Sequence, residues 1–441
     1  MEKPEKVPLV PPNLKVPFIL LILCFAAWGA AANLTDVLVA VFRSIFTMSN
    51  FQSTLVQSAY YGAYFLLAIP AAFINSRFGY KAGVLTGLGL AAVGGLLFLP
   101  ASNMLQYGAF LAALFVLAAG LSILETSANP FMLAMGDERT STRRLNLAQA
   151  FNPIGANIGV LIGAMLILPR LTPEASKVIM SPEELVESQR ADLHHVMVPY
   201  IGIAAVLLLI WVLIAVSKVR LPDTPEKSLT VKVAEKRSRG GVLGRLWANR
   251  RYRYGVIAQF FNVGGQTCVW TFTVIYAQDV VGISQDSAGW WLQASLLLFL
   301  VSRFVMTALL TIFRPTKLLL VMATFGVLCG ITAMFSLNIV GLIAVVAMSA
   351  GLSLMFPTIY GVALEGMGDD ATFGAAGLVM AILGGAFLPL VHAAIMDIAG
   401  TAMGYVIPAA CMAIVALYGL YDLMAPKVED LVGAPEEGES E

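Results

Sequence analysis

Residues 135–138 read Met-Gly-Asp-Glu, and residues 367–370 read Met-Gly-Asp-Asp, 232 positions further along the chain. A short basic turn repeats at nearly the same distance, because residues 77–81 are matched by residues 314–317 at offsets of 236 and 237. Sequence features that recur at nearly the same separation along the chain indicate an internal duplication. The chain is therefore expected to consist of two similar halves.

Long apolar segments dominate both halves. The 441 residues are 59% hydrophobic and only 12% charged, and their mean hydropathy is +0.82, whereas soluble domains carry about 25% charged residues. A spanning helix needs about 20 mostly apolar residues. The twelve candidate spans are 18–42, 54–75, 82–100, 106–134, 146–168, 198–217, 254–279, 288–311, 317–337, 339–364, 374–398 and 404–424. The expected fold is an all-α membrane protein with twelve transmembrane helices in two pseudo-symmetric six-helix halves, the major facilitator architecture.

Basic residues are distributed unevenly between the connecting segments. With the N-terminus in the cytoplasm, 22 of the 27 lysines and arginines fall on the cytoplasmic side and four fall outside. The positive-inside rule then predicts an even number of spans with both termini inside. We expect an N-terminal half 1–217, a basic cytoplasmic linker 218–253, a C-terminal half 254–424 and an acidic, disordered tail 425–441.

The composition excludes several classes of protein. Lys and Arg balance Asp and Glu at 27 each, so the chain has no net positive field for nucleic acid. Its four cysteines are isolated in apolar runs, and its three histidines form no H-E-x-x-H motif, so neither a disulfide framework nor a metal site is expected. The loops carry no catalytic constellation, and the chain is expected not to be an enzyme.

The outer loop 169–197 is long enough to carry structure of its own. Within it, Ser181 can cap a helix, Pro182 suits the first helical position, and Glu184 suits the third. We expect a short surface helix there.

Three spans of the first half each present two polar residues on one helix face. The pairs, spaced three or four residues apart, are Asn33 with Asp36, Glu125 with Asn129, and Gln149 with Asn152. Lipid offers such groups no partner, so the three faces must point at each other or into a wet cavity. A purely structural hydrogen-bond cluster is the alternative, but a carboxylate there costs about 2.5–3.5 kcal/mol on insertion scales.

Asp36 and Glu125 are the only acids deep within the spans, and Arg303 in the other half is the only deep base. A buried carboxylate without a partner favours its protonated form, so at least one of these acids is expected to hold a proton in some state. A proton-coupled transporter requires such a site. Arg303 could bind an anion, but we favour a structural pairing with an acid near the inner mouth.

Neutral polar and aromatic residues at helical spacing suit a sugar, which needs several donors and acceptors and an apolar face. They are Asn262, Gln266 and Trp270 along one stripe of the seventh span, and Trp28 and Tyr60 in the first half. For each aromatic residue taken singly, packing or interface anchoring is an equally good explanation. His392, toward the outer end of the eleventh span, is expected to be satisfied locally and not to relay protons.

At these residues the sequence resembles the fucose/galactose/glucose–proton symporter family of the major facilitator superfamily. The stretches that carry the resemblance are 32–36 (Ala-Asn-Leu-Thr-Asp), 125–131 (Glu-Thr-Ser-Ala-Asn-Pro-Phe), 145–152 (Leu-Asn-Leu-Ala-Gln-Ala-Phe-Asn), 180–184 (Met-Ser-Pro-Glu-Glu) and 259–267 (Gln-Phe-Phe-Asn-Val-Gly-Gly-Gln-Thr). The likeness spans nearly the whole chain. It implies proton-coupled symport of a monosaccharide by alternating access, with L-fucose as the expected sugar and another hexose, glucose or galactose, as the alternative.

The resemblance also implies roles for particular residues. The acid on the fourth span, Glu125, is tied to sugar binding, and the acid on the first span, Asp36, is tied to proton movement. The implied sugar contacts in the first half are Asn33, Gln149 and Asn152. No cofactor is implied, because the proton is the coupling ion. At Ala32, Thr35 and Pro153 the family pattern has two asparagines and a serine, so the polar lining is reduced here.

Other classes of membrane protein fit less well. A channel needs a symmetric ring or filter, which a single chain with a two-fold repeat lacks, and a non-transporting receptor is the remaining alternative. The expected partners are a small sugar and the lipid bilayer, without nucleic acid. We expect a monomer in the bacterial cytoplasmic (inner) membrane with both termini in the cytoplasm.

Overall fold

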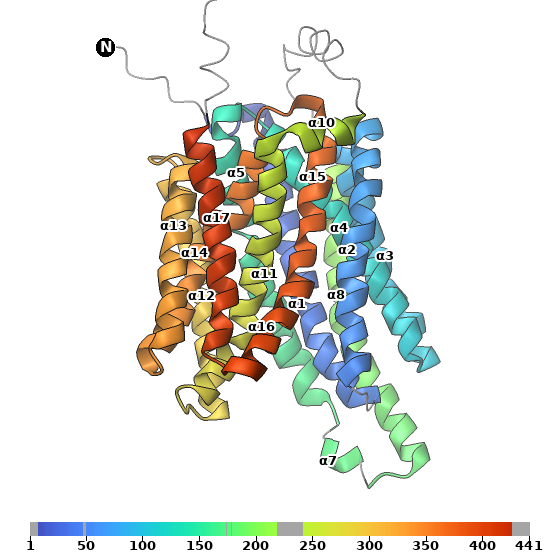
Figure 1. The fold of residues 1–441 in the computed structure, drawn as a ribbon. Helices are drawn as coiled ribbons and strands as arrows, with labels where there is room; N and C mark the ends of the chain where they lie inside the picture. Colours follow the sequence, from blue (N-terminus) through green and yellow to red (C-terminus); the bar gives the residue numbers. More distant parts are fainter. Residues whose placement is uncertain (1–7, 47–49, 173, 178, 218–240, 426–441) are drawn as a thin grey trace, which may run out of the picture.

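The computed structural model describes residues 8–46, 50–172, 174–177, 179–217 and 241–425 (Figure 1). Residues 35–46 and 50–58 are described by their backbone only. Within the described residues the regular secondary structure is entirely helical. Most of the expected linker and the expected acidic tail lie outside the described residues.

The helices follow the order expected for two six-span halves. In the first half they are α1 (Lys15–Phe46), α2 (Asn50–Phe78), α3 (Tyr80–Met104), α4 (Tyr107–Ala134), α5 (Ser141–Gln149), α6 (Asn152–Ile162), α7 (Glu174–Lys177) and α8 (Pro182–Val216). The helix α10 (Val242–Ala248) lies in the expected linker, and the second half contains α11 (Arg250–Asp279), α12 (Gln285–Leu309), α13 (Pro315–Phe335), α14 (Ile339–Leu364), α15 (Ala371–Met380), α16 (Gly384–Ala399) and α17 (Val406–Met424).

Ten stretches of the described chain are long and apolar enough to cross a membrane. The long helices α2 and α11, which carry more polar residues, bring the number to the twelve that the sequence predicts. The chain is a multi-pass membrane protein, as its composition predicts.

The fifth and eleventh spans are broken helices. The fifth is divided into α5 and α6, which are separated at residues 150–151, and the eleventh into α15 and α16, which are separated by the 3-10 turn η7 (Ala381–Leu383). The two breaks lie about 232 residues apart, the offset of the sequence repeat. The duplication therefore extends to the irregularities of the helices, which in transporters gather at mid-membrane.

A capping box starts α8 where the sequence predicts it. The Ser181 hydroxyl accepts a hydrogen bond from the Glu184 N–H, and the Glu184 carboxylate accepts one from the Ser181 N–H at 2.8 Å. The expectation of a separate short surface helix was wrong, because α8 continues without interruption through Pro199 to Val216. The part of α8 before Pro199 buries Leu193 and Val196, so it packs an apolar face against the rest of the protein.

Helix α1 packs against α6 at very short range in the first half. Gly29 lies against the backbone at Asn152, and Gly155 and Gly159 lie against the backbone of α1, so that a Cβ atom at any of the three glycines would collide. Small residues allow spanning helices this close approach. The sugar-site candidates on α1 and α6 are therefore carried on one tightly packed helix pair.

The two halves meet at the end of the bundle where α1 begins and where α8 and α17 finish, at the top of Figure 1; we call it the basic end. There the Tyr80 hydroxyl lies 3.0 Å from the Thr372 hydroxyl, and Asn146 donates to the Thr358 hydroxyl at 3.2 Å. The aromatic rings of α2 and α15 also meet edge to face. These contacts close the basic end.

Candidate functional site

Glu125 lies on α4 of the first half and is only 1% exposed. Within the described part of the chain, neither of its carboxylate oxygens has a hydrogen-bond partner. The carboxylate lies within electrostatic range of the hydroxyls of Tyr64 on α2 and Tyr360 on α14. The Tyr360 hydroxyl is buried and has no described hydrogen bond either. Leaving buried polar atoms unpaired costs about 1–3 kcal/mol each, so these groups suit a proton, a water or a polar ligand.

Three aromatic residues from two helices form a connected group beside this acid. The Trp28 indole N–H donates to the Tyr64 hydroxyl at 2.8 Å, and the Tyr60 hydroxyl donates to it at 3.2 Å. The rings of Tyr60 and Tyr64 stack with centroids 4.9 Å apart. The structure therefore brings together the two aromatic residues expected in the first half, through a third that the sequence analysis missed.

The polar faces of the fourth and fifth spans meet directly. The Gln149 side-chain amide donates to the Asn129 side-chain oxygen at 2.9 Å, and both side chains are buried. Asn152, which begins α6 after the helix break, donates instead to the backbone carbonyl of Phe25 on α1 at 3.3 Å. Glu125, Asn129 and Gln149 thus form one continuous polar surface, and Asn152 faces α1.

The first span is only partly described at its polar residues. The Asn33 side chain is half-buried and donates to the Gly29 carbonyl, one turn earlier on its own helix, at 3.0 Å. Asp36 lies on α1 one turn further, but its side chain lies outside the described residues. The expected pairing of Asn33 and Asp36 on one polar face remains a prediction.

The candidates of the seventh span divide into a buried and a half-buried group. Trp270 is half-buried and held on two sides, because its indole N–H donates to the Ser349 hydroxyl at 3.1 Å and its ring meets Phe299 of α12 edge to face at 5.0 Å. Gln266 is half-buried, whereas Asn262 is 1% exposed and its amide atoms have no described hydrogen-bond partner. Asn262 therefore keeps its full hydrogen-bonding capacity for a water or a ligand.

Arg303 makes no ion pair with any acid whose side chain the structure describes, and the expected pairing with an acid stays a prediction. Its Nε donates to the Ser353 carbonyl at 2.9 Å, and its Nη1 donates to the Gln149 carbonyl at 2.6 Å. The guanidinium carbon lies 4.8 Å from the ring centroid of Phe299. Two backbone oxygens and an aromatic face therefore surround the guanidinium.

His392 is fully buried in an aromatic cluster of the second half. Its ring stacks on Phe272 at 4.1 Å and meets Tyr405 edge to face at 5.2 Å. Neither ring nitrogen has a hydrogen-bond partner among the described residues. The expectation that His392 is satisfied locally holds for its packing but not for its hydrogen bonds.

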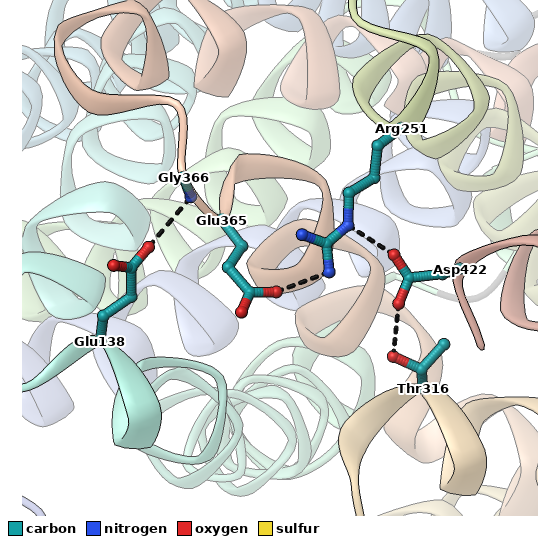
Figure 2. A network of polar contacts seen from close by, with 6 residues as sticks. All are labelled: Glu138, Arg251, Thr316, Glu365, Gly366 and Asp422. Carbon is teal, nitrogen blue, oxygen red and sulfur yellow. Dashed lines mark hydrogen bonds and ion pairs between the residues drawn. The ribbon is translucent and has the colours of Figure 1, made fainter. Parts of the chain in front are cut away.

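At the basic end, Arg251 connects three elements of the second half (Figure 2). It binds Glu365, which follows α14, at 2.6 Å and Asp422 of α17 at 2.5 Å. Asp422 also accepts a hydrogen bond from the Thr316 hydroxyl at the start of α13, at 2.7 Å. The network fixes the loop that follows α14 to the rest of its half.

The same loop is bound by the first half. The Glu138 carboxylate accepts a hydrogen bond from the Gly366 backbone N–H at 3.0 Å, next to Glu365 in Figure 2. Nearby, Arg245 of α10 forms a two-pronged contact with Asp370 at 2.6 and 2.8 Å, and the hydrogen bonds and charge of Asp370 raise the pKa of Arg245 above its ordinary value. Glu138, in the first of the repeated landmarks, thus takes part in closing the basic end, whereas Asp370, in the second, fixes α10 to the second half.

A family model, that of the Major Facilitator Superfamily, matches residues 18–382. This chain belongs to the major facilitator superfamily. The superfamily assignment agrees with the paired halves, the broken fifth and eleventh spans and the buried polar residues between them.

Relatives within the superfamily match nearly the whole chain. An L-fucose-proton symporter of Haemophilus influenzae is 38% identical and one of Escherichia coli is 37% identical; the alignments cover 92% of this chain and 96% and 93% of those proteins. A glucose/galactose transporter of Brucella abortus is 32% identical over 91% of this chain and 92% of its own. The relatives are named as transporters and symporters, not as enzymes, and symporters that use the proton need no cofactor.

Solved structures of the superfamily give the same architecture. The crystal structure of the transporter FucP in the outward conformation matches with a TM-score of 0.84 and 36% identity, over 93% of this chain and 99% of that one. A proton:xylose symporter, XylE, matches with a TM-score of 0.66 at 12% identity over 93% of this chain and 95% of that one, which supports the fold only.

Three residues of the site region escaped the sequence analysis. Tyr64 lies four residues after Tyr60 on the same helix face, and Phe299 lies four residues before Arg303, so helical spacing from a candidate could have indicated both. Tyr360 is a single tyrosine in an apolar span, and no local pattern marks it.

Proposed function

We propose that this chain carries L-fucose together with protons across the membrane by alternating access of its two halves. The observation that carries the proposal is the buried, unpartnered carboxylate of Glu125 beside the amides of Asn129 and Gln149. The names of the 37–38% identical relatives support the sugar and the coupling ion. Another hexose, glucose or galactose, is the second candidate, which the Brucella abortus relative supports.

In this proposal the sugar binds between the halves. Its hydroxyls bind side-chain amides and the Glu125 carboxyl group, and its C–H face packs on aromatic rings. The residues assigned to the sugar site are Asn33, Glu125, Asn129, Gln149, Asn152, Asn262, Gln266, Trp270, Trp28 and Tyr60. Asp36 and Glu125 handle the proton, with Asp36 as the carrier and Glu125 linking protonation to sugar binding.

Transport by the purified chain in proteoliposomes tests the proposal. We expect L-fucose counterflow without chemical change of the sugar, and accumulation when the outside is made more acidic than the lumen. A protonophore should abolish accumulation but leave counterflow. If glucose or galactose competes with labelled L-fucose better than unlabelled L-fucose does, the sugar assignment is wrong. If no sugar of the panel is taken up, the symporter proposal fails.

We also propose how the chain lies in the membrane. The halves are 1–217 and 254–424, joined by the linker 218–253 and followed by the tail 425–441, in a monomer within the bacterial inner membrane. The basic end faces the cytoplasm, because lysines and arginines concentrate there. The closed basic end then leaves the sugar site to be reached from outside.

Cysteine labelling tests this orientation. A membrane-impermeant thiol reagent added to intact cells should label Glu187→Cys, in the exposed outer part of α8, and should miss Arg139→Cys at the basic end. Both positions are exposed, and the four native cysteines are buried, so the background is low. The reverse labelling pattern would invert the proposed orientation.

A further inference from the structure

Pro130, Pro153 and Pro357 are three of the prolines inside membrane-spanning segments, and each deprives one carbonyl of its helical donor. A helix carbonyl normally accepts from the N–H four residues later, and proline has no N–H. Pro130, Pro153 and Pro357 therefore leave the carbonyls of residues 126, 149 and 353 without that donor. Lipid cannot supply a donor, but a side chain from another helix can.

Side chains do supply the donors at all three positions. The Asn75 amide donates to the Thr126 carbonyl at 3.3 Å, from α2 to α4 within the first half. Arg303 serves the other two carbonyls, at Ser353 and Gln149. One guanidinium thus satisfies two proline-freed carbonyls, which explains why a buried arginine in this chain needs no acid.

The two carbonyls bound by Arg303 belong to different halves. Ser353 lies on α14 and the stacked Phe299 on α12, so both fix the guanidinium within its own half. Gln149 ends α5 in the first half, at the break that Pro153 follows. Arg303 is 4% exposed, so water does not compete with this bond in the closed state.

We propose that Arg303 is a positioning residue that holds the two halves together while the basic end is closed. The acceptor in the first half is the Gln149 carbonyl, which Pro153 leaves free. Alternating access requires one half to rock against the other. Opening the basic end moves α5 away from α12 and α14, so the hydrogen bond from Arg303 to the Gln149 carbonyl breaks. The hydrogen bond from Arg303 to the Ser353 carbonyl stays intact, because both residues belong to the second half. The inference rests on alternating access and not on which sugar is bound.

The bond is strong enough to set the conformational balance. Hydrogen bonds from a charged donor contribute more than neutral ones, and losing one corresponds to a shift of roughly 10- to 100-fold in an equilibrium. Removing the guanidinium should therefore move the population measurably toward the state that is open at the basic end.

The test measures the distance between the halves in the purified full chain. Spin labels on Arg139→Cys and Asp369→Cys, two exposed positions in opposite halves at the basic end, report opening as a longer distance in pulsed electron paramagnetic resonance. We expect Arg303→Met to increase the long-distance population about 10-fold or more. Pro153→Ala restores an N–H that competes with Arg303 for the Gln149 carbonyl. We expect this variant also to increase the long-distance population, by about 3- to 5-fold.

Pro130→Ala is the matched control. It also restores an N–H to a proline-freed carbonyl in a spanning helix, but the donor and the acceptor there lie in the same half, so the distance distribution should stay as in the parent. Arg303→Met with the parental distribution would overturn the proposal. If Arg303→Met fails to fold, Pro153→Ala provides the test. A distance distribution of Pro153→Ala that equals that of Pro130→Ala would also overturn the proposal. Sugar transport is not part of this readout, so a wrong sugar assignment leaves the result unchanged.

Discussion

An Asp36→Asn protein is expected to lose proton-driven accumulation of sugar completely and to keep sugar exchange across the membrane. Asparagine preserves the size and most of the hydrogen bonding of aspartate but cannot bind and release a proton. Accumulation needs net proton movement, whereas exchange of internal for external sugar does not. Both rates can be measured on one preparation of proteoliposomes, with and without an imposed pH gradient.

Asn33→Ala is the matched control for this first span. It removes a polar side chain on the same helix but no titratable group, so it should weaken sugar binding and leave the proton requirement intact. An Asp36→Asn protein that still accumulates sugar against its gradient would remove Asp36 from the proton path. Failure of exchange together with accumulation, in a monodisperse and folded protein, would show that Asp36 has a structural role instead.

Substitutions at Glu125 are expected to separate protonation from hydrogen bonding. Glu125→Gln imitates the protonated carboxyl permanently, so it should bind sugar with an affinity that no longer falls as the pH rises. Glu125→Ala removes the hydrogen-bonding group as well and leaves sugar hydroxyls unpaired in a buried cavity. Hydrogen bonds to an ionisable group contribute about 1.5–3 kcal/mol, so affinity should fall roughly 10- to 150-fold.

Calorimetric titration with sugar between pH 5 and 9 distinguishes the two variants. Tyr64→Phe serves as the control, because it removes a hydroxyl close to Glu125 without changing the acid. A Glu125→Gln protein whose affinity follows pH in the same way as the parent would place the proton elsewhere. Equal affinity in Glu125→Ala and the parent would remove Glu125 from the sugar site.

Much of the fold could be predicted because the membrane restricts what a chain can do. Each span needs about 20 mostly apolar residues, so the order of the helices follows from the hydropathy along the chain. The counts of lysine and arginine assign each connecting loop to one side of the membrane. The repeat offset also agrees with the position of both helix breaks. The interruption expected between the outer loop and the sixth span was wrong, since Pro199 lies within α8 without ending it.

The geometry of the candidate site could be predicted where helical spacing was sufficient, and could not where contacts between helices decide. Glu125, Asn129 and Gln149 form one surface because polar side chains in lipid must find each other. Tyr360 lies more than 200 residues from Glu125 in the sequence, and only the packing of the two halves brings it near. Charge alone suggests an acid as the partner of Arg303, whereas the partners that the structure describes are two backbone carbonyls that prolines leave free.

Two of the cross-half bonds described above use a backbone atom as the partner in one half. Arg303 binds the carbonyl of Gln149 and Glu138 binds the N–H of Gly366, so neither bond depends on the side chain at the bound position. The side chain of residue 149, which faces the polar surface at Asn129, can therefore change during evolution without removing the bond to its carbonyl. Relatives that transport different sugars could thus diverge at this position while the mechanism that switches between conformations stays the same.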